Sequence, residues 1–213
     1  MTYLQLVNKI LIRLRENEVT SVQDNPYSKL IGEFVNVVKR EVEDSWNWQA
    51  LRNTITANTV NQAFSYKLTG TDTRIRISDV INDTTNQVLE PRSSAWFNKQ
   101  FLIVPPETGE PFYYNLNGIS EDGEVQVDLY PIPDGSYAVR FNLFQPEPDL
   151  IEDGDTVRTP YQVIVEGAVA RAISERGDDG GYTEQEQRYN RILSDYIAME
   201  AGTRPEETTW YAV

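Results

Sequence analysis

Residues 25–51 read NPYSKLIGEFVNVVKREVEDSWNWQAL, a segment that joins a helix start, a long apolar helical face and an abrupt change of pattern. Asn25 suits the N-cap of a helix and Pro26 suits its first position. The spacing therefore predicts a long amphipathic helix that ends at the aromatic pair Trp46 and Trp48. Its apolar face consists of Tyr27, Leu30, Ile31, Phe34, Val35, Val38 and Val42.

A shorter helix is predicted upstream of this segment. Thr2 and Gln5 have the spacing of a capping box, in which each side chain bonds the backbone of the other residue. One apolar face follows at helical spacing. It comprises Tyr3, Leu6, Val7, Ile10, Leu11 and Leu14.

After residue 51 the period of the apolar residues changes from 3.6 to 2, which is typical of half-buried antiparallel strands. Turn dipeptides such as Asp122-Gly123 and Asp134-Gly135 separate the alternating stretches. Residues 93–100 interrupt them as a short helix. The alternating residues are Phe64, Tyr66, Leu68, Ile75, Ile77, Val125, Val127, Leu129, Tyr137, Val139, Phe141 and Leu143.

Helical spacing returns after residue 155. Thr159 and Pro160 predict a cap followed by a first-turn proline, and Thr183 with Glu186 predicts a capping box for a last helix. Gly167 keeps one helix slim enough for a neighbour to approach closely. We expect an α+β fold, in which residues 1–51 and 156–202 form a four-helix bundle and residues 52–155 form an inserted antiparallel β module.

Composition restricts the chemistry of the 213-residue chain. It has no histidine and no cysteine, so imidazole catalysis and thiolate metal sites are excluded. The net charge of −14 opposes binding to nucleic acid. We expect a protein that is made in the cytoplasm, since the chain shows neither a secretory signal nor a membrane span.

The acidic residues offer two alternatives to a purely structural role, and neither is favoured. A calcium site is conceivable at the cluster around Gly154, but the spacing of a calcium loop is missing, and a solvated connector is the better interpretation. A carboxylate pair for glycoside hydrolysis is also conceivable, although no acid is singled out by its neighbours. We therefore predict neither cofactor nor metal. The cluster comprises Glu147, Asp149, Glu152, Asp153 and Asp155.

Aromatic residues of the β module are candidates for a contact surface. Trp96 and Phe97 lie in the short helix, and Tyr113 and Tyr114 are consecutive, so they must point to opposite faces of a strand. Some aromatic surface is thus left outside any one core. Burial by an adjacent subunit is the favoured interpretation, and stacking on a sugar or nucleobase is the alternative.

The last eleven residues, 203–213, show no periodicity. A frayed terminus and a segment that becomes ordered on a partner through its aromatic residues are equally compatible with this sequence. Candidate docking residues are Thr203, Arg204, Pro205, Thr208, Thr209, Trp210, Tyr211 and Val213.

The order of elements and three short patches resemble a known family. The patches are Trp46-Asn47-Trp48, residues 130–135 (YPIPDG) and the helix with Gly167-Ala168 that ends in Glu175-Arg176. They are similar to the head-to-tail adaptor proteins of short-tailed bacteriophages, often called tail tubular protein A. The similarity covers nearly the whole chain.

This resemblance implies a structural virion protein rather than an enzyme. It implies a ring of twelve copies between the portal protein and the tail nozzle protein, with genomic DNA passing through the channel without specific binding. It further implies that residues 203–213 engage the portal and that the β module contacts the nozzle. Peptidoglycan hydrolysis, credited to some relatives, finds no supporting residues here. The alternative from another class is a glycan-binding or glycan-cleaving β module on a helical stalk.

Overall fold

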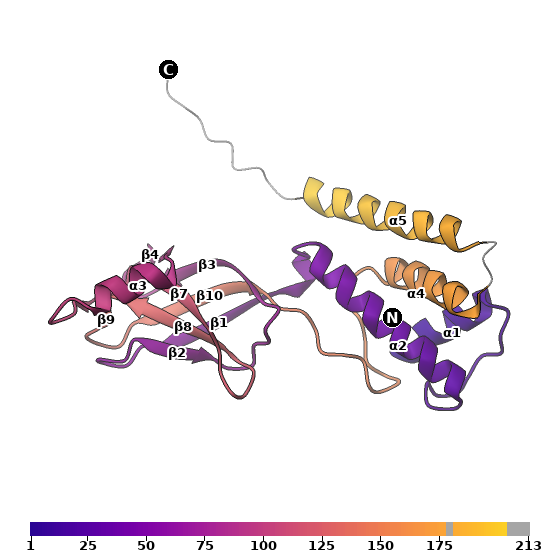
Figure 1. The fold of residues 1–213 in the computed structure, drawn as a ribbon, viewed down its shortest axis with the longest axis horizontal. Coiled ribbons are helices and arrows are strands. Elements are labelled where there is room, and N and C mark those ends of the chain that lie inside the picture. Colours follow the sequence, from indigo (N-terminus) through magenta and orange to yellow (C-terminus); the bar gives the residue numbers. More distant parts are fainter. Residues whose placement is uncertain (178–180, 204–213) are drawn as a thin grey trace, which may run out of the picture. The chain divides into compact units, whose positions relative to one another are not determined.

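The computed structural model describes residues 1–177 and 181–203, and it divides the chain into two compact units. The helical unit contains residues 1–51 and 147–213, and the β unit contains residues 52–146 (Figure 1). The predicted α+β class is confirmed, because helices and antiparallel sheets occur in separate parts of the chain.

The helical unit begins with the two helices that the sequence predicts most clearly. Thr2 caps α1 through the expected box with Gln5, and Asn25 caps α2 by accepting a hydrogen bond from the N–H of Ser28. The helices of this unit are α1 (Tyr3–Arg13), α2 (Pro26–Ser45), the 3-10 turn η1 (Gln49–Leu51), α4 (Tyr161–Arg176) and α5 (Tyr182–Gly202).

The predicted caps of the last two helices are wrong. Pro160 occupies the N-cap position of α4, where no side chain caps the helix, and Thr159 is buried. Helix α5 begins at Tyr182 after Gly181, so Thr183 lies inside its first turn instead of at the cap. The N-termini of α4 and α5 are therefore determined by packing and not by a capping side chain.

Helix α4 is the most deeply buried helix of the unit, and it packs against α1, α2 and α5. Gly167 makes this possible, as the sequence suggests. A Cβ placed at Gly167 would lie 2.6 Å from Cγ1 of Val38 on α2 and 2.9 Å from Cε2 of Tyr189 on α5. The absence of a side chain thus lets two helices approach α4 at the same level.

The segment after the β unit is held by α2. Lys39, whose side chain is fully buried, forms a 2.8 Å ion pair with Glu43 one turn later. The same ammonium donates hydrogen bonds to the backbone oxygens of Glu147 and Pro148 at 2.9 and 3.0 Å. Asn36 bonds both backbone groups of Leu150. Residues 147–155, which the sequence analysis assigns to the β module, therefore pack with the helical unit.

The β unit is a sandwich of two four-stranded sheets, with strand orders β1-β10-β3-β4 and β2-β8-β7-β5. Pairing is antiparallel except between β5 and β7, and β6 and β9 form a separate parallel pair. The elements are β1 (Arg52–Asn58), β2 (Ser65–Leu68), β3 (Arg76–Asn82), β4 (Gln87–Val88), β5 (Glu90–Pro91), α3 (Ser94–Phe101), β6 (Thr108–Gly109), β7 (Tyr113–Ile119), β8 (Val125–Tyr130), β9 (Ile132–Pro133) and β10 (Ala138–Phe144).

Both sheets contribute to one core, and a short strap joins them at one edge. The strap, residues 87–91, consists of β4 and β5 separated only by Leu89, which is buried. The chain thus passes from the edge of one sheet to the edge of the other. The core comprises Leu68, Val80, Leu89, Tyr114, Val127, Leu129, Val139, Phe141 and Leu143.

Candidate interaction surfaces

The helix α3 carries the largest aromatic cluster of the β unit. Ser93 caps this helix, and the ring of Trp96 lies 4.8 Å from Tyr113 and 5.5 Å from Tyr130 between centroids. Phe101, at the end of the helix, lies 5.8 Å from Tyr130. These edge-on contacts fix α3 against strands β7 and β8.

Arg92 adds a charge to the cluster. Its guanidinium lies 4.9 Å from the ring centroid of Tyr113 and 5.9 Å from that of Trp96, which are cation–π distances. It also forms a 2.7 Å ion pair with Glu90. The half-buried rings of Trp96 and Tyr113 therefore lie beneath the positively charged guanidinium of Arg92.

The four predicted contact residues fall into two groups. Trp96 and Tyr113 are half-buried in the aromatic cluster, where they retain exposed surface. Phe97 is 1% exposed beneath α3, and Tyr114 points to the other face of β7, into the sandwich core. Burial raises the pKa of Tyr114, and the carboxylate of Asp79 adds to the shift. Only Trp96 and Tyr113 of these four offer substantial ring surface to a partner.

The loop after α3 exposes apolar side chains that the sequence analysis did not single out. Leu102 is 79% exposed, Ile103 53% and Val104 90%. Three consecutive apolar residues precede Pro105 and Pro106, and this run fits neither a helical nor a strand period. The run was the signal in the sequence from which the exposed apolar loop could have been predicted. Exposed apolar groups of this kind favour a protein contact.

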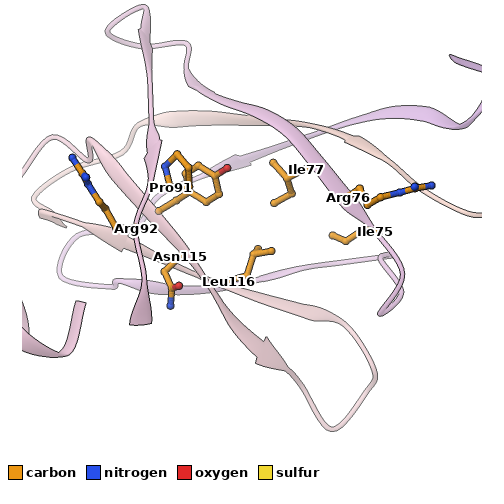
Figure 2. Close-up of a pocket in the computed structure, with 8 residues that line it drawn as sticks. Ile75, Arg76, Ile77, Pro91, Arg92, Asn115 and Leu116 are labelled. Atoms are coloured by element: carbon orange, nitrogen blue, oxygen red, sulfur yellow. The ribbon is translucent and has the colours of Figure 1, made fainter. Parts of the chain in front are cut away.

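A second surface is a groove of about 450 Å³ beside the strap (Figure 2). Its apolar part is formed by Ile75 and Ile77 near the start of β3 and by Leu116 on β7, and Arg76 and Arg92 lie at opposite ends. The eight residues that line it are Ile75, Arg76, Ile77, Pro91, Arg92, Tyr114, Asn115 and Leu116.

The helical unit contains a buried carboxylate surrounded by cations. Glu166 forms ion pairs with Arg13 at 2.8 Å and Arg188 at 3.3 Å, and the amide of Gln185 donates to it at 2.6 Å. Burial acts to raise the pKa of Glu166. The hydrogen bonds from Arg13 and Gln185 and the charges of both arginines outweigh this and hold it below its usual range. This cluster joins α1, α4 and α5.

The acidic cluster around Gly154 is used within the loop itself. The carboxylate of Asp155 accepts the backbone N–H groups of Ile151 and Glu152 at 2.8 Å, and these bonds lower its pKa. Asp149 pairs with Arg40. Within residues 1–177 and 181–203, no group of three or more acidic side chains is arranged to hold a metal ion.

Of the predicted docking tail, the structure describes only Thr203. Its N–H donates to the backbone oxygen of Glu200 as the C-cap of α5. The other candidates, Arg204, Pro205, Thr208, Thr209, Trp210, Tyr211 and Val213, lie outside the described residues. Among the described helices, none has the length and apolar character needed to cross a membrane.

The chain thus combines a helical unit, interrupted in sequence by a β sandwich, with exposed aromatic and apolar side chains that are candidate contact surfaces for other macromolecules. Residues 1–209 match the family model of the SU10 adaptor protein, and the chain belongs to this family of bacteriophage adaptors. A search of curated proteins found no match. The protein is therefore a structural component of a phage virion, and as an adaptor it interacts with other virion proteins such as those of the portal and tail.

Proposed function

We propose that the protein is a ring-forming head-to-tail adaptor that links the portal to the tail nozzle and lines part of the DNA channel. The match to the adaptor family over residues 1–209 carries this proposal. In this role the protein resembles the tail tubular protein A adaptors, and the four helices of the helical unit act as a bundle that packs beside its neighbours.

Exposed apolar residues of the helical unit support self-association. Ile12 on α1 is 56% exposed, Ile151 in the loop after the β unit 71%, and Met199 on α5 66%. They lie on different elements, which suits an arrangement in which one copy uses two different surfaces to contact its two neighbours. Head-to-tail contacts of this kind form a ring when the rotation between neighbouring copies closes.

The charge of the chain supports passage of DNA without binding. Twelve copies at −14 each would carry −168, so a channel within the ring would repel phosphate and let DNA slide. Adhesion to DNA would instead require a basic lining. The proposed mechanism is thus steric connection combined with electrostatic repulsion.

Sedimentation and negative-stain microscopy of the full chain, alone and mixed with portal protein, test this function. We expect rings, either free or assembled on the portal. A variant that ends at Thr203 tests the docking tail, because it should lose binding to the portal while it keeps the fold of the helical unit. A protein that stays monomeric beside the portal, or a ring with a positively charged channel, would contradict the proposal.

A further inference from the structure

A basic cleft of about 240 Å³ lies in the helical unit, between α1, α4 and α5. It contains three cations, although the net charge of the chain is −14. The cleft therefore differs in sign from the chain as a whole. The residues that decide its charge and its apolar surface are Lys9, Arg13, Val165, Glu166, Arg188 and Ile192.

The carboxylate of Glu166 does not balance the cations of the cleft. Arg13 and Arg188 both pair with it, at 2.8 and 3.3 Å, so two positive charges share one negative charge. The ammonium of Lys9 lies 5.0 Å from the ring centroid of Tyr161, a cation–π contact that does not neutralise its charge. Glu166 therefore holds the arginines in position and leaves the cleft with an excess of positive charge.

An acidic surface is formed on the same unit where the loop of residues 147–155 packs beside α2. Its acids are Glu33 on α2 and Asp149, Glu152 and Asp153 in the loop. Burial raises the pKa of Tyr3 to about 12, and the negative charges of Glu33, Asp149 and Asp153 add to this shift, which places these three carboxylates around one region. Asp149 pairs with Arg40, and Glu33 is exposed to solvent.

Both surfaces combine charge with apolar side chains. Ile192 is half-buried in the basic cleft, whereas Val37, one turn after Glu33, is 37% exposed and Ile151 in the loop is 71% exposed. The basic cleft and the acidic surface share no residue and are formed by different helices. One copy can therefore present both surfaces at the same time.

We propose that the basic cleft of one copy receives the acidic surface of a second copy of this chain. Glu33 and its neighbouring acids would face Lys9 and the arginines, and the apolar side chains of both surfaces would meet beside them. Because the two surfaces differ, successive copies join head to tail, as a ring requires. The proposal rests on the proposed ring-forming function and names the surfaces that neighbouring copies would use.

A second copy suits the basic cleft better than DNA does. The cleft is small, and a long polyanion that enters it would also meet the field of a chain with a net charge of −14. The acidic surface of another copy is a local group of carboxylates with apolar residues among them. It therefore matches the cleft in both charge and apolar character.

Carbodiimide cross-linking of the unaltered full-length chain tests the contact, because this reagent joins a lysine amine to a carboxylate beside it. Assemblies are prepared from a mixture of isotopically labelled and unlabelled chains, with portal protein added where rings require it. Mass spectrometry then identifies peptides that join a labelled copy to an unlabelled one. We expect such peptides to link Lys9 to the acids of the acidic surface.

Charge reversal provides an independent measurement by sedimentation. Lys9→Glu and Glu33→Lys should each raise the protein concentration needed for ring formation by about tenfold or more, because like charges then face each other across the contact. The double variant should recover part of this loss, since opposite charges face each other again. Lys99→Glu is the matched control, because Lys99 is exposed on α3, outside both surfaces, and circular dichroism verifies the fold of every variant.

Cross-links between copies that omit these two surfaces would overturn the inference, and so would losses that simply add in the double variant. Duplex DNA is titrated in parallel; binding that disappears in Lys9→Glu would assign the cleft to phosphate and would also overturn it. Rings that persist in both single variants contradict the cleft contact alone. An unaltered chain that forms no ring, with or without portal protein, contradicts the adaptor function as well.

Discussion

Replacing Gly167 by alanine should destabilise the helical unit, although alanine is the better helix former. The added methyl would lie 2.6 Å from Val38 and 2.9 Å from Tyr189, so two neighbouring helices must move. Overpacking of this kind costs about 1–3 kcal/mol, and contacts on two sides place the cost near the upper end. Helix propensity returns about 1 kcal/mol. The expected net loss is about 2 kcal/mol.

Thermal unfolding monitored by circular dichroism measures this loss, which corresponds to a melting temperature lower by about 4–8 °C for a chain of this size. Gly154→Ala is the matched control. A Cβ at Gly154 meets no atom within 4 Å, and the variant should stay within about 0.5 kcal/mol of the native protein.

A double-mutant cycle with Val38→Ala isolates the contact. This change removes the Cγ1 atom that the new methyl would meet, so Gly167→Ala should cost about 1 kcal/mol less in that background. A Gly167→Ala variant as stable as the native chain, or a cycle without coupling, would refute the close approach of the helices.

Three further perturbations address the helical unit. Lys39→Met removes the buried cation that pairs with Glu43 and should cost about 3–5 kcal/mol in urea unfolding. Lys39→Met with Glu43→Leu should recover only part of this loss, because the backbone oxygens of Glu147 and Pro148 also lose their donor; equal losses would argue against the pair. Thr2→Ala should cost about 1 kcal/mol in thermal unfolding through loss of the cap, and an unchanged midpoint would exclude that role. Because the folded-state pKa of Glu166 is depressed, its stabilisation is present above the unfolded value near 4.5 and is lost as the pH falls through the folded value. The stability difference between the native chain and Glu166→Gln should therefore be full at neutral pH and shrink in acid, and a pH-independent difference would contradict it.

The sequence predicted features of the helices correctly where one residue caps a helix or allows close helix packing. Asn25 and Thr2 cap the helices that they were expected to cap, and Gly167 marks a real close approach. Thr159 and Thr183 show the same residue types without the same role, since the surrounding packing decides the start of α4 and α5. Residue type alone does not separate the two cases.

The strand β1 shows a different limit. Its sequence, RNTITAN, is polar, and its residues are mostly exposed, so no alternation of apolar residues identifies it. It forms because β10 offers a complete partner edge from Ala138 to Phe144. Strand pairing of this kind depends on residues distant in the sequence.

The candidate surfaces were predictable only in part. The aromatic residues Trp96 and Tyr113 stand out in the sequence, and the structure brings them together. The groove joins residues 75–77 to residues 114–116 through the strap, and no sequence period connects these stretches. The apolar run at Leu102 follows the predicted short helix of residues 93–100, and the sequence analysis assigned it no role.

Every buried apolar residue of the helical core comes from residues 1–51 or 147–213. The chain leaves the helical unit after Leu51, which is buried in that core. It returns at residues 147 and 148, whose backbone oxygens accept hydrogen bonds from Lys39. The sandwich therefore contributes no buried apolar residue to the described helical core. We expect that replacing it by a short linker would leave that core intact.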